Sequence, residues 1–231
     1  MYPAVEFLTG LLFLASYLVF GSTVDALKWA VFAAILLVLA VTDLRERILP
    51  DKVNFFGIIA GLLFSFFTNP MDGTALWLAK RWFDFPPPQF VLSFVDSSLG
   101  VLVGGGILWA VAEGWFRVFK QEGMGFGDVK MIAMMGAFLG AQRTFLTILL
   151  GSMIGSVVGI INIAGLYLFG YKRQIAIRAA RRGLGGENML RYTLAKRYQL
   201  PFGTYLAAGG LATVYFGTPA LHWYKALIAG K

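Results

Sequence analysis

The sequence "ALKWAVFAAILLVLAVTD", residues 26–43, carries charge only near its two ends, at Lys28 and Asp43. At 1.5 Å per residue, an 18-residue helix is about 27 Å long, close to the roughly 30 Å of a bilayer's hydrocarbon core. We therefore expect a membrane-spanning helix here. The unusual feature is its end, because an acid stands where the apolar run meets water.

The rest of the chain has the same character. Its 231 residues are 58% apolar and only 14% charged, whereas a soluble domain is about a quarter charged. In lipid a lone segment must satisfy its own backbone hydrogen bonds, so every span is expected to be a helix. We predict an all-α polytopic membrane protein, a single domain over residues 1–231. The seven candidate transmembrane helices are 3–21, 26–43, 53–68, 93–113, 129–142, 144–169 and 202–217.

The basic residues predict which side of the membrane each loop occupies. Fourteen of the 20 Lys and Arg lie in and beside the loops after the second, fourth and sixth spans. Cytoplasmic loops are enriched in these residues, so the N-terminus is expected to be cytoplasmic. The loop 171–200 has eight basic residues and one acid. We interpret it as a cytoplasmic loop that also touches anionic lipid headgroups; the alternative is a docking surface for an acidic partner. We expect no nucleic acid partner.

The composition excludes several kinds of active site. The chain has no cysteine and one histidine, His222, which excludes thiolate zinc sites, a cysteine nucleophile and the H-E-x-x-H zinc motif. The predicted topology places His222 on the outer side, which disfavours a Ser–His pair. "GMGFGD", residues 123–128, superficially suggests a dinucleotide loop, but no strand precedes it. We expect no metal site.

Two carboxylates remain as candidates, Asp43 and Asp128, because the predicted topology places both at the cytoplasmic ends of spans. Ionisable residues this close to lipid are functional candidates by default. Alternatives stay open for each one. Asp43 could pair with neighbouring arginines, and Asp128 could cap its helix, as Asp51 could cap the third span. The fifth span is short, which predicts a wetted notch near the cytoplasmic surface rather than a site deep in lipid.

Such a pair would suffice for peptide hydrolysis. Two close carboxylates cannot both ionise easily, so they share a proton. The ionised one takes a proton from water, which attacks the peptide carbonyl carbon, and the protonated one donates to the carbonyl oxygen. Gly125 and Gly127 lack side chains, so we expect them to admit unusual dihedral angles and to let a substrate backbone approach.

Four stretches of the sequence resemble a known family. "EGMGFGDVKMIAMMGAFLG" (122–140) contains the G-x-G-D signature of membrane aspartic proteases and is similar to the second catalytic motif of bacterial type IV prepilin peptidases. "TDLRERILPDKVN" (42–54) resembles their first motif. "LPFGTYLAAGG" (200–210) resembles the start of their last span, and "YPAVEFLTGLLF" (2–13) resembles the segment after their cysteine-bearing domain. The four motifs occur in the family's order.

The resemblance implies an enzyme of the bacterial inner membrane that removes basic leaders from prepilins and pseudopilins at the cytoplasmic face, typically after a glycine. Asp43 and Asp128 match the family's catalytic pair. Members with the cysteine-bearing domain also methylate the new N-terminus using S-adenosylmethionine. This sequence begins where that domain would end and has no cysteine, so we expect the protease portion alone, with no cofactor for proteolysis and with S-adenosylmethionine only if methylation is retained.

Three other functions were weighed. A transporter or channel subunit would use the acids as coupling-ion ligands, but the sequence has no internal repeat and the acids lie at one face. A scaffold would explain the basic loop and leave the aspartates unexplained. A presenilin-like or signal-peptide-peptidase-like enzyme would keep the same chemistry on another substrate; "ILPDK" (48–52) and "LPFG" (200–203) favour prepilins.

Overall fold

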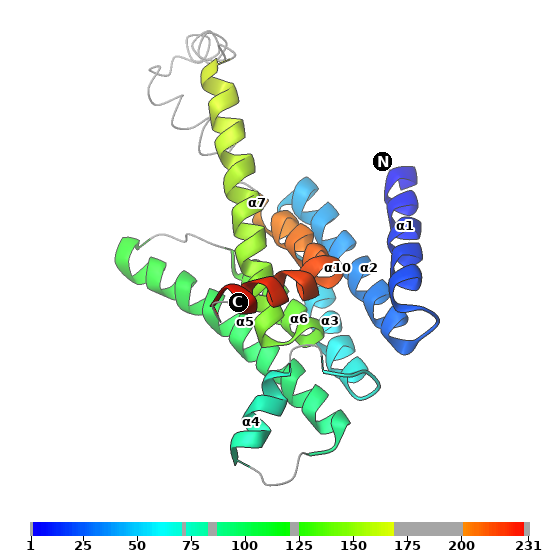
Figure 1. Ribbon diagram of the computed structural model, residues 1–231. Coiled ribbons are helices and arrows are strands. Elements are labelled where there is room, and N and C mark those ends of the chain that lie inside the picture. Colours follow the sequence, from blue (N-terminus) through cyan, green and yellow to red (C-terminus); the bar gives the residue numbers. More distant parts are fainter. Residues whose placement is uncertain (1, 71–72, 83–86, 121–124, 169–200, 229–231) are drawn as a thin grey trace, which may run out of the picture.

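The computed structural model describes residues 2–70, 73–82, 87–120, 125–168 and 201–228 (Figure 1). All regular secondary structure in these ranges is helical. The helices are α1 (Tyr2–Phe20), α2 (Val24–Glu46), α3 (Asp51–Ser65), α4 (Thr74–Trp82), α5 (Gln89–Phe119), α6 (Phe126–Leu139), α7 (Ala141–Leu168) and α10 (Phe202–Ile228).

The all-α polytopic fold is confirmed, whereas the number of spans stays a prediction. Among the described residues, four helices contain stretches long and apolar enough to cross a membrane: α1, α2, α5 and α7. Helices α3 and α6 have 15 and 14 residues, fewer than the roughly 20 that a span needs. Helix α4 was not predicted; it lies in the expected outer loop, 69–92. The basic loop 171–200 falls outside the described residues.

Helix α6 is the centre of the bundle, in contact with α2, α3, α5, α7 and α10 (Figure 1). Every residue from Met131 to Leu139 except Ala133 is buried. A short helix without charge after its first turns can be enclosed on all sides, because its apolar side chains need no contact with water. Helix α1 stands at the side of the bundle against α2, with most of its large apolar side chains exposed.

Glycines allow the helices around this core to approach closely. Gly100 of α5 and Gly136 of α6 face each other, and a Cβ on either would overlap the other's carbonyl oxygen. In α7, a Cβ on Gly151 would lie 2.9 Å from Leu206 Cδ2 of α10, and one on Gly155 would lie 3.1 Å from Tyr205 Cδ2. Small residues serve this purpose in lipid, where packing drives helix association.

Two further glycine contacts give the relative direction of α3 and α6. A Cβ on Gly57 of α3 would press on Met134 of α6, and one on Gly61 would lie 2.7 Å from Ala137 Cβ. Residue numbers rise together in both helices, so α3 and α6 run parallel. Their N-terminal turns therefore lie at one end of the bundle, with Asp128 of α6 near Asp51 of α3.

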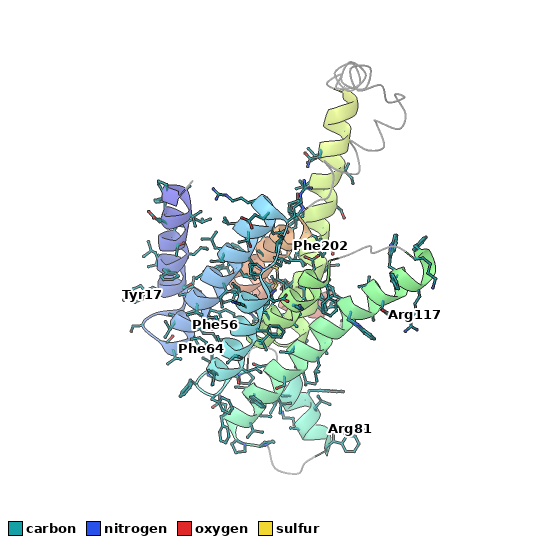
Figure 2. The ribbon with its side chains drawn as sticks, turned by 180° about the vertical axis from the view of Figure 1, so that it is seen from behind. Tyr17, Phe56, Phe64, Arg81, Arg117 and Phe202 are labelled. Carbon is teal, nitrogen blue, oxygen red and sulfur yellow. The ribbon has the colours of Figure 1, made fainter. Side chains whose placement is uncertain are left out.

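A separate polar cluster lies at the opposite end, around the start of α5. The buried carboxylate of Asp96 accepts hydrogen bonds from the first residues of α4: the Thr74 hydroxyl and the Ala75 and Gly73 amides, the last two at 2.9 and 3.2 Å. Asp96 thus caps α4 from another helix, satisfying amides that have no partner within α4. Figure 2 shows α4 at the edge of the molecule, with Arg81 near its tip.

The close contact between α5 and α6 predicts a selective effect of alanine. Gly136→Ala forces a Cβ against the backbone of α5, and overpacking of this kind costs about 1–3 kcal/mol. Gly106→Ala, also on α5, meets no atom within 4 Å and should leave stability unchanged or slightly higher. Thermal unfolding of both variants in detergent measures the difference. Equal melting temperatures would contradict this account of the α5–α6 contact.

Candidate active site

Asp43 lies in the last turns of α2, where the helix is about to end. Arg47 terminates α2 in the left-handed conformation, with φ 56°, and its N–H donates to the Asp43 carbonyl oxygen at 3.0 Å. The Asp43 side chain is 6% exposed. The helix, and not the loop beyond it, therefore sets the direction of the Asp43 side chain.

The partner of the Asp43 carboxylate is the start of α10. Oδ2 accepts a hydrogen bond from the Thr204 amide at 2.8 Å, and the Thr204 hydroxyl lies 3.1 Å from the same oxygen. Thr204 is in the first turn of α10, beside Phe202 (Figure 2), where amides have no partner within the helix. Asp43 thus caps α10 from another helix.

Asp128 lies in the first turn of α6 and is 8% exposed. The helix is capped by Gly125, whose carbonyl oxygen accepts from the Asp128 amide at 3.1 Å. Asp128 is therefore inside the helix and is not its cap, which removes one of the alternatives open at the sequence level. It lies before the fifth predicted span and outside the four long apolar helices.

The environment of Asp128 favours its neutral form. Desolvation by burial, and secondarily the charge of Asp43, raise the pKa of Asp128 from 3.8 to about 7. Because the charge of Asp43 contributes to this raised pKa, the two carboxyl groups, one on α2 and one on α6, lie within electrostatic reach of each other. The structure thus brings together the two acids that the sequence singled out.

Leu49 lies between the first turns of α6 and α10, against Gly127 and Gly203. It belongs to the short connection between α2 and α3. A Cβ on Gly127 would lie 3.0 Å from Leu49 Cβ, and one on Gly203 would lie 3.2 Å from both Leu49 δ-carbons. The same Cβ on Gly203 would lie 3.1 Å from Asp43 Oδ2. Larger residues at either glycine would therefore crowd Leu49.

Gly125 and Gly127 differ from the expectation in one respect. Gly125 has φ −68° and Gly127 has no positive φ, so neither position needs the unusual dihedral angles that only glycine adopts easily. A Cβ on Gly125 would lie 3.7 Å from Asp128 Oδ2, an ordinary contact. What these glycines provide is space beside the acid, and their role toward a substrate stays a prediction.

Asp51 also differs from its expected role. Pro50 is the residue that caps α3, with no side-chain hydrogen bond, and Asp51 is the first residue of the helix. Its carboxylate pairs instead with Lys130 of α6 at 2.6 Å. This ion pair, partly exposed on both sides, joins the first turns of α3 and α6 next to Asp128.

Leu49, Gly203 and Thr204 were not predicted as site residues. Gly203 and Thr204 fall within the "LPFGTYLAAGG" stretch, which was noted only as a resemblance. The signal that could have identified them is a small residue followed by a hydrogen-bond donor at the start of a helix. Within the ranges that the structure covers, no group of three His, Cys, Asp or Glu side chains could hold a metal ion.

The chain is similar in sequence to several known proteins. Residues 30–160 match the model of the type IV leader peptidase family. The chain is 28% identical over 223 residues to the prepilin leader peptidase/N-methyltransferase of Aeromonas hydrophila, covering 96% of this chain and 61% of that protein. The protein of the same name in Pseudomonas putida is 30% identical, with coverage of 94% and 59%. That of Myxococcus xanthus is 35% identical, with coverage of 69% and 42%.

The chain thus spans about three-fifths of the length of the first of these relatives. No solved structure matches it significantly. The family model covers more than half of the chain and includes both Asp43 and Asp128. The chain therefore belongs to the type IV leader peptidase family.

Proposed function

We propose that this chain is an endopeptidase of the bacterial inner membrane that cleaves the basic leader from prepilins or pseudopilins at the cytoplasmic face, with Asp43 and Asp128 as its catalytic pair. Family membership supports the substrate class. The observation that supports the pair is the burial of two carboxyl groups, from different helices, close enough for one charge to raise the pKa of the other.

The surroundings suggest a different role for each acid. Asp43 receives two contacts from Thr204 at the start of α10, from the amide at 2.8 Å and from the hydroxyl at 3.1 Å. Asp128 is protonated at and below neutral pH because its pKa is raised to about 7. We assign Asp128 as the general acid because its raised pKa keeps it protonated below about pH 7, and this leaves Asp43 as the general base.

Hydrolysis then proceeds in two steps. Asp43 takes a proton from water while the water oxygen bonds to the carbonyl carbon, and Asp128 protonates the carbonyl oxygen, giving a tetrahedral diol. Asp128 next recovers a proton from one diol hydroxyl, Asp43 gives its proton to the amide nitrogen, and the carbon–nitrogen bond breaks. Both acids end in their starting states, and no cofactor or metal takes part.

Methylation is not included in the proposal. The relatives' names include N-methyltransferase, and that reaction would need S-adenosylmethionine as methyl donor. We assign none of the residues described at the Asp43–Asp128 site to the binding of S-adenosylmethionine.

Neutral substitutions test the pair directly. Asp43→Asn and Asp128→Asn should each abolish cleavage of a peptide with a basic leader, a glycine and a hydrophobic segment, while the proteins still insert into membranes. Asp51→Asn, which changes only a partly exposed ion pair, should retain cleavage within a few-fold. Product masses report the outcome. Processing retained in either of the first two variants would refute the assignment, and ion flux without cleavage by the parent protein would favour a transporter.

Stability should move in the opposite direction for one of these variants. The folded-state pKa of Asp128 lies above its ordinary value of 3.8, so folding binds a proton and the parent protein loses stability as pH rises from about 4 to 7. Asparagine resembles the protonated acid. Asp128→Asn should therefore melt higher than the parent at pH 8 and nearly equal to it at pH 4, which thermal unfolding in detergent can measure.

The general-acid role also predicts a pH profile. Cleavage requires protonated Asp128, so kcat/KM should fall as pH rises through about 7. Rates measured from pH 5 to pH 9 with the leader peptide give this alkaline limb. A rate that stays constant up to pH 9 would exclude Asp128 as the proton donor.

The role of Gly125 in substrate access can be separated from stability. A Cβ there meets only Asp128 Oδ2, at 3.7 Å, so Gly125→Ala should fold normally. If a substrate backbone passes beside this acid, misplacement by the added methyl should lower kcat/KM roughly tenfold or more. Gly114→Ala, which meets nothing within 4 Å, is the matched control and should change neither property.

A further inference from the structure

Asn54 of α3 is a buried polar residue that packing does not explain. Its side chain is 0% exposed, and neither its amide nitrogen nor its amide oxygen has a hydrogen-bond partner among the described residues. A buried amide without partners lowers stability, whereas an apolar group of similar shape would not. Such a group in a native structure calls for a functional explanation.

The parallel packing of α3 and α6 places Asn54 near the acids. Asn54 stands between Asp51, which pairs with Lys130, and Gly57, which lies against Met134. It therefore lies at the level of Met131, one turn beyond Asp128 along α6. The offset between the two residues along the helix axes is thus about one turn, roughly 5.4 Å, and a bridging water can join polar groups that are too far apart for a direct hydrogen bond.

The contact between α3 and α2 indicates the same position for Asn54. Besides Met134, a Cβ on Gly57 would lie 3.5 Å from Ile35 Cδ1 of α2. Helix α2 runs antiparallel to α3, so one turn back along α3, at Asn54, corresponds to one turn forward along α2, at Leu39. Asp43 follows one turn later. Asn54 thus lies one layer inside both acids, on the side away from the helix ends.

We propose that Asn54 is a positioning residue for Asp128: a water bridges its carboxamide to the Asp128 carboxyl group and fixes the orientation in which that group gives up its proton. This inference rests on the proposed function. The proposed role explains why the contact between α3 and α6 contains a polar residue, although every α6 residue from Met134 to Leu139 is buried and none is charged.

Another buried donor shows why Asn54 is distinct. The indole nitrogen of Trp29 has no hydrogen-bond partner in the described part of the chain either. Its ring, however, packs against Phe20 and Phe32, with centroids 5.9 and 5.7 Å away, so aromatic packing accounts for the residue. Asn54 has no such ring, and its only chemical capability is hydrogen bonding.

Leucine at this position separates a positioning role from a structural one. Asn54→Leu should melt at the same temperature as the parent or higher, yet its kcat should fall at least tenfold with KM changed less than twofold. Asn54→Thr, which keeps a hydroxyl, should recover part of the lost kcat. Trp29→Phe, the control far from the acids, should keep the parent's kcat.

The pH profile supplies a second readout that a packing role would not move. The titratable groups described near Asp128 are Asp43 of α2, the Asp51–Lys130 ion pair, and Tyr205 of α10 within electrostatic reach of Asp43, and none changes in these variants. Loss of the bridging donor destabilises ionised Asp128, so the alkaline limb of kcat/KM should shift to higher pH in Asn54→Leu.

The outcomes distinguish the two proposals. A parent protein that fails to cleave the leader peptide refutes the proposed function. A parent that cleaves, together with an Asn54→Leu variant of unchanged kcat and pH profile, refutes the role of Asn54. If Asn54→Leu does not fold, Asn54→Ala, which also lacks a hydrogen-bonding group, decides: parental kcat per folded molecule with an unshifted pH profile overturns the inference.

Discussion

The burial of most of a helix too short to cross a bilayer is the constraint on which the rest of the structure depends. Helix α6 has 14 residues, roughly 21 Å at 1.5 Å per residue. Its neighbours enclose most of the helix, so Asp128 in the first turn is buried although Phe126, the first residue of the helix, is 59% exposed. A carboxyl group in that turn is desolvated by the protein itself. The raised pKa of Asp128 is thus a consequence of helix length and packing.

Asp43 reaches the same region by a different route. Its carboxylate is held by an amide and a hydroxyl that lie 161 residues further along the chain, so the start of α10 and the end of α2 must meet before the site exists. The two acids therefore differ in how they are kept in place. One is isolated from water by close-packed apolar helices, and the other is fastened by hydrogen bonds to a helix N-terminus.

Much of this could be predicted from the sequence, because its main signals are periodic or compositional. Apolar runs predicted the helices, counting basic residues brought Asp43 and Asp128 together, and the spacing of Gly151 and Gly155 within α7 is that of a close helix contact. Helix α4 was missed because its nine residues are amphipathic and depend on Asp96, 22 residues beyond Thr74. Leu49 and Asn54 were missed because an apolar residue and an amide carry no distinctive pattern; only their surroundings give them meaning.

The attachment of Asp43 to α10 has a stereochemical consequence. Both contacts from Thr204 converge on one oxygen, Oδ2, and under the proposed function Oδ1 is the atom that exchanges a proton with water. The two oxygens of one carboxylate are thereby made inequivalent, since only one of them anchors the fold. A proton arriving on Oδ1 leaves the anchor intact, so α10 can stay docked while the acid passes through its charged and neutral states.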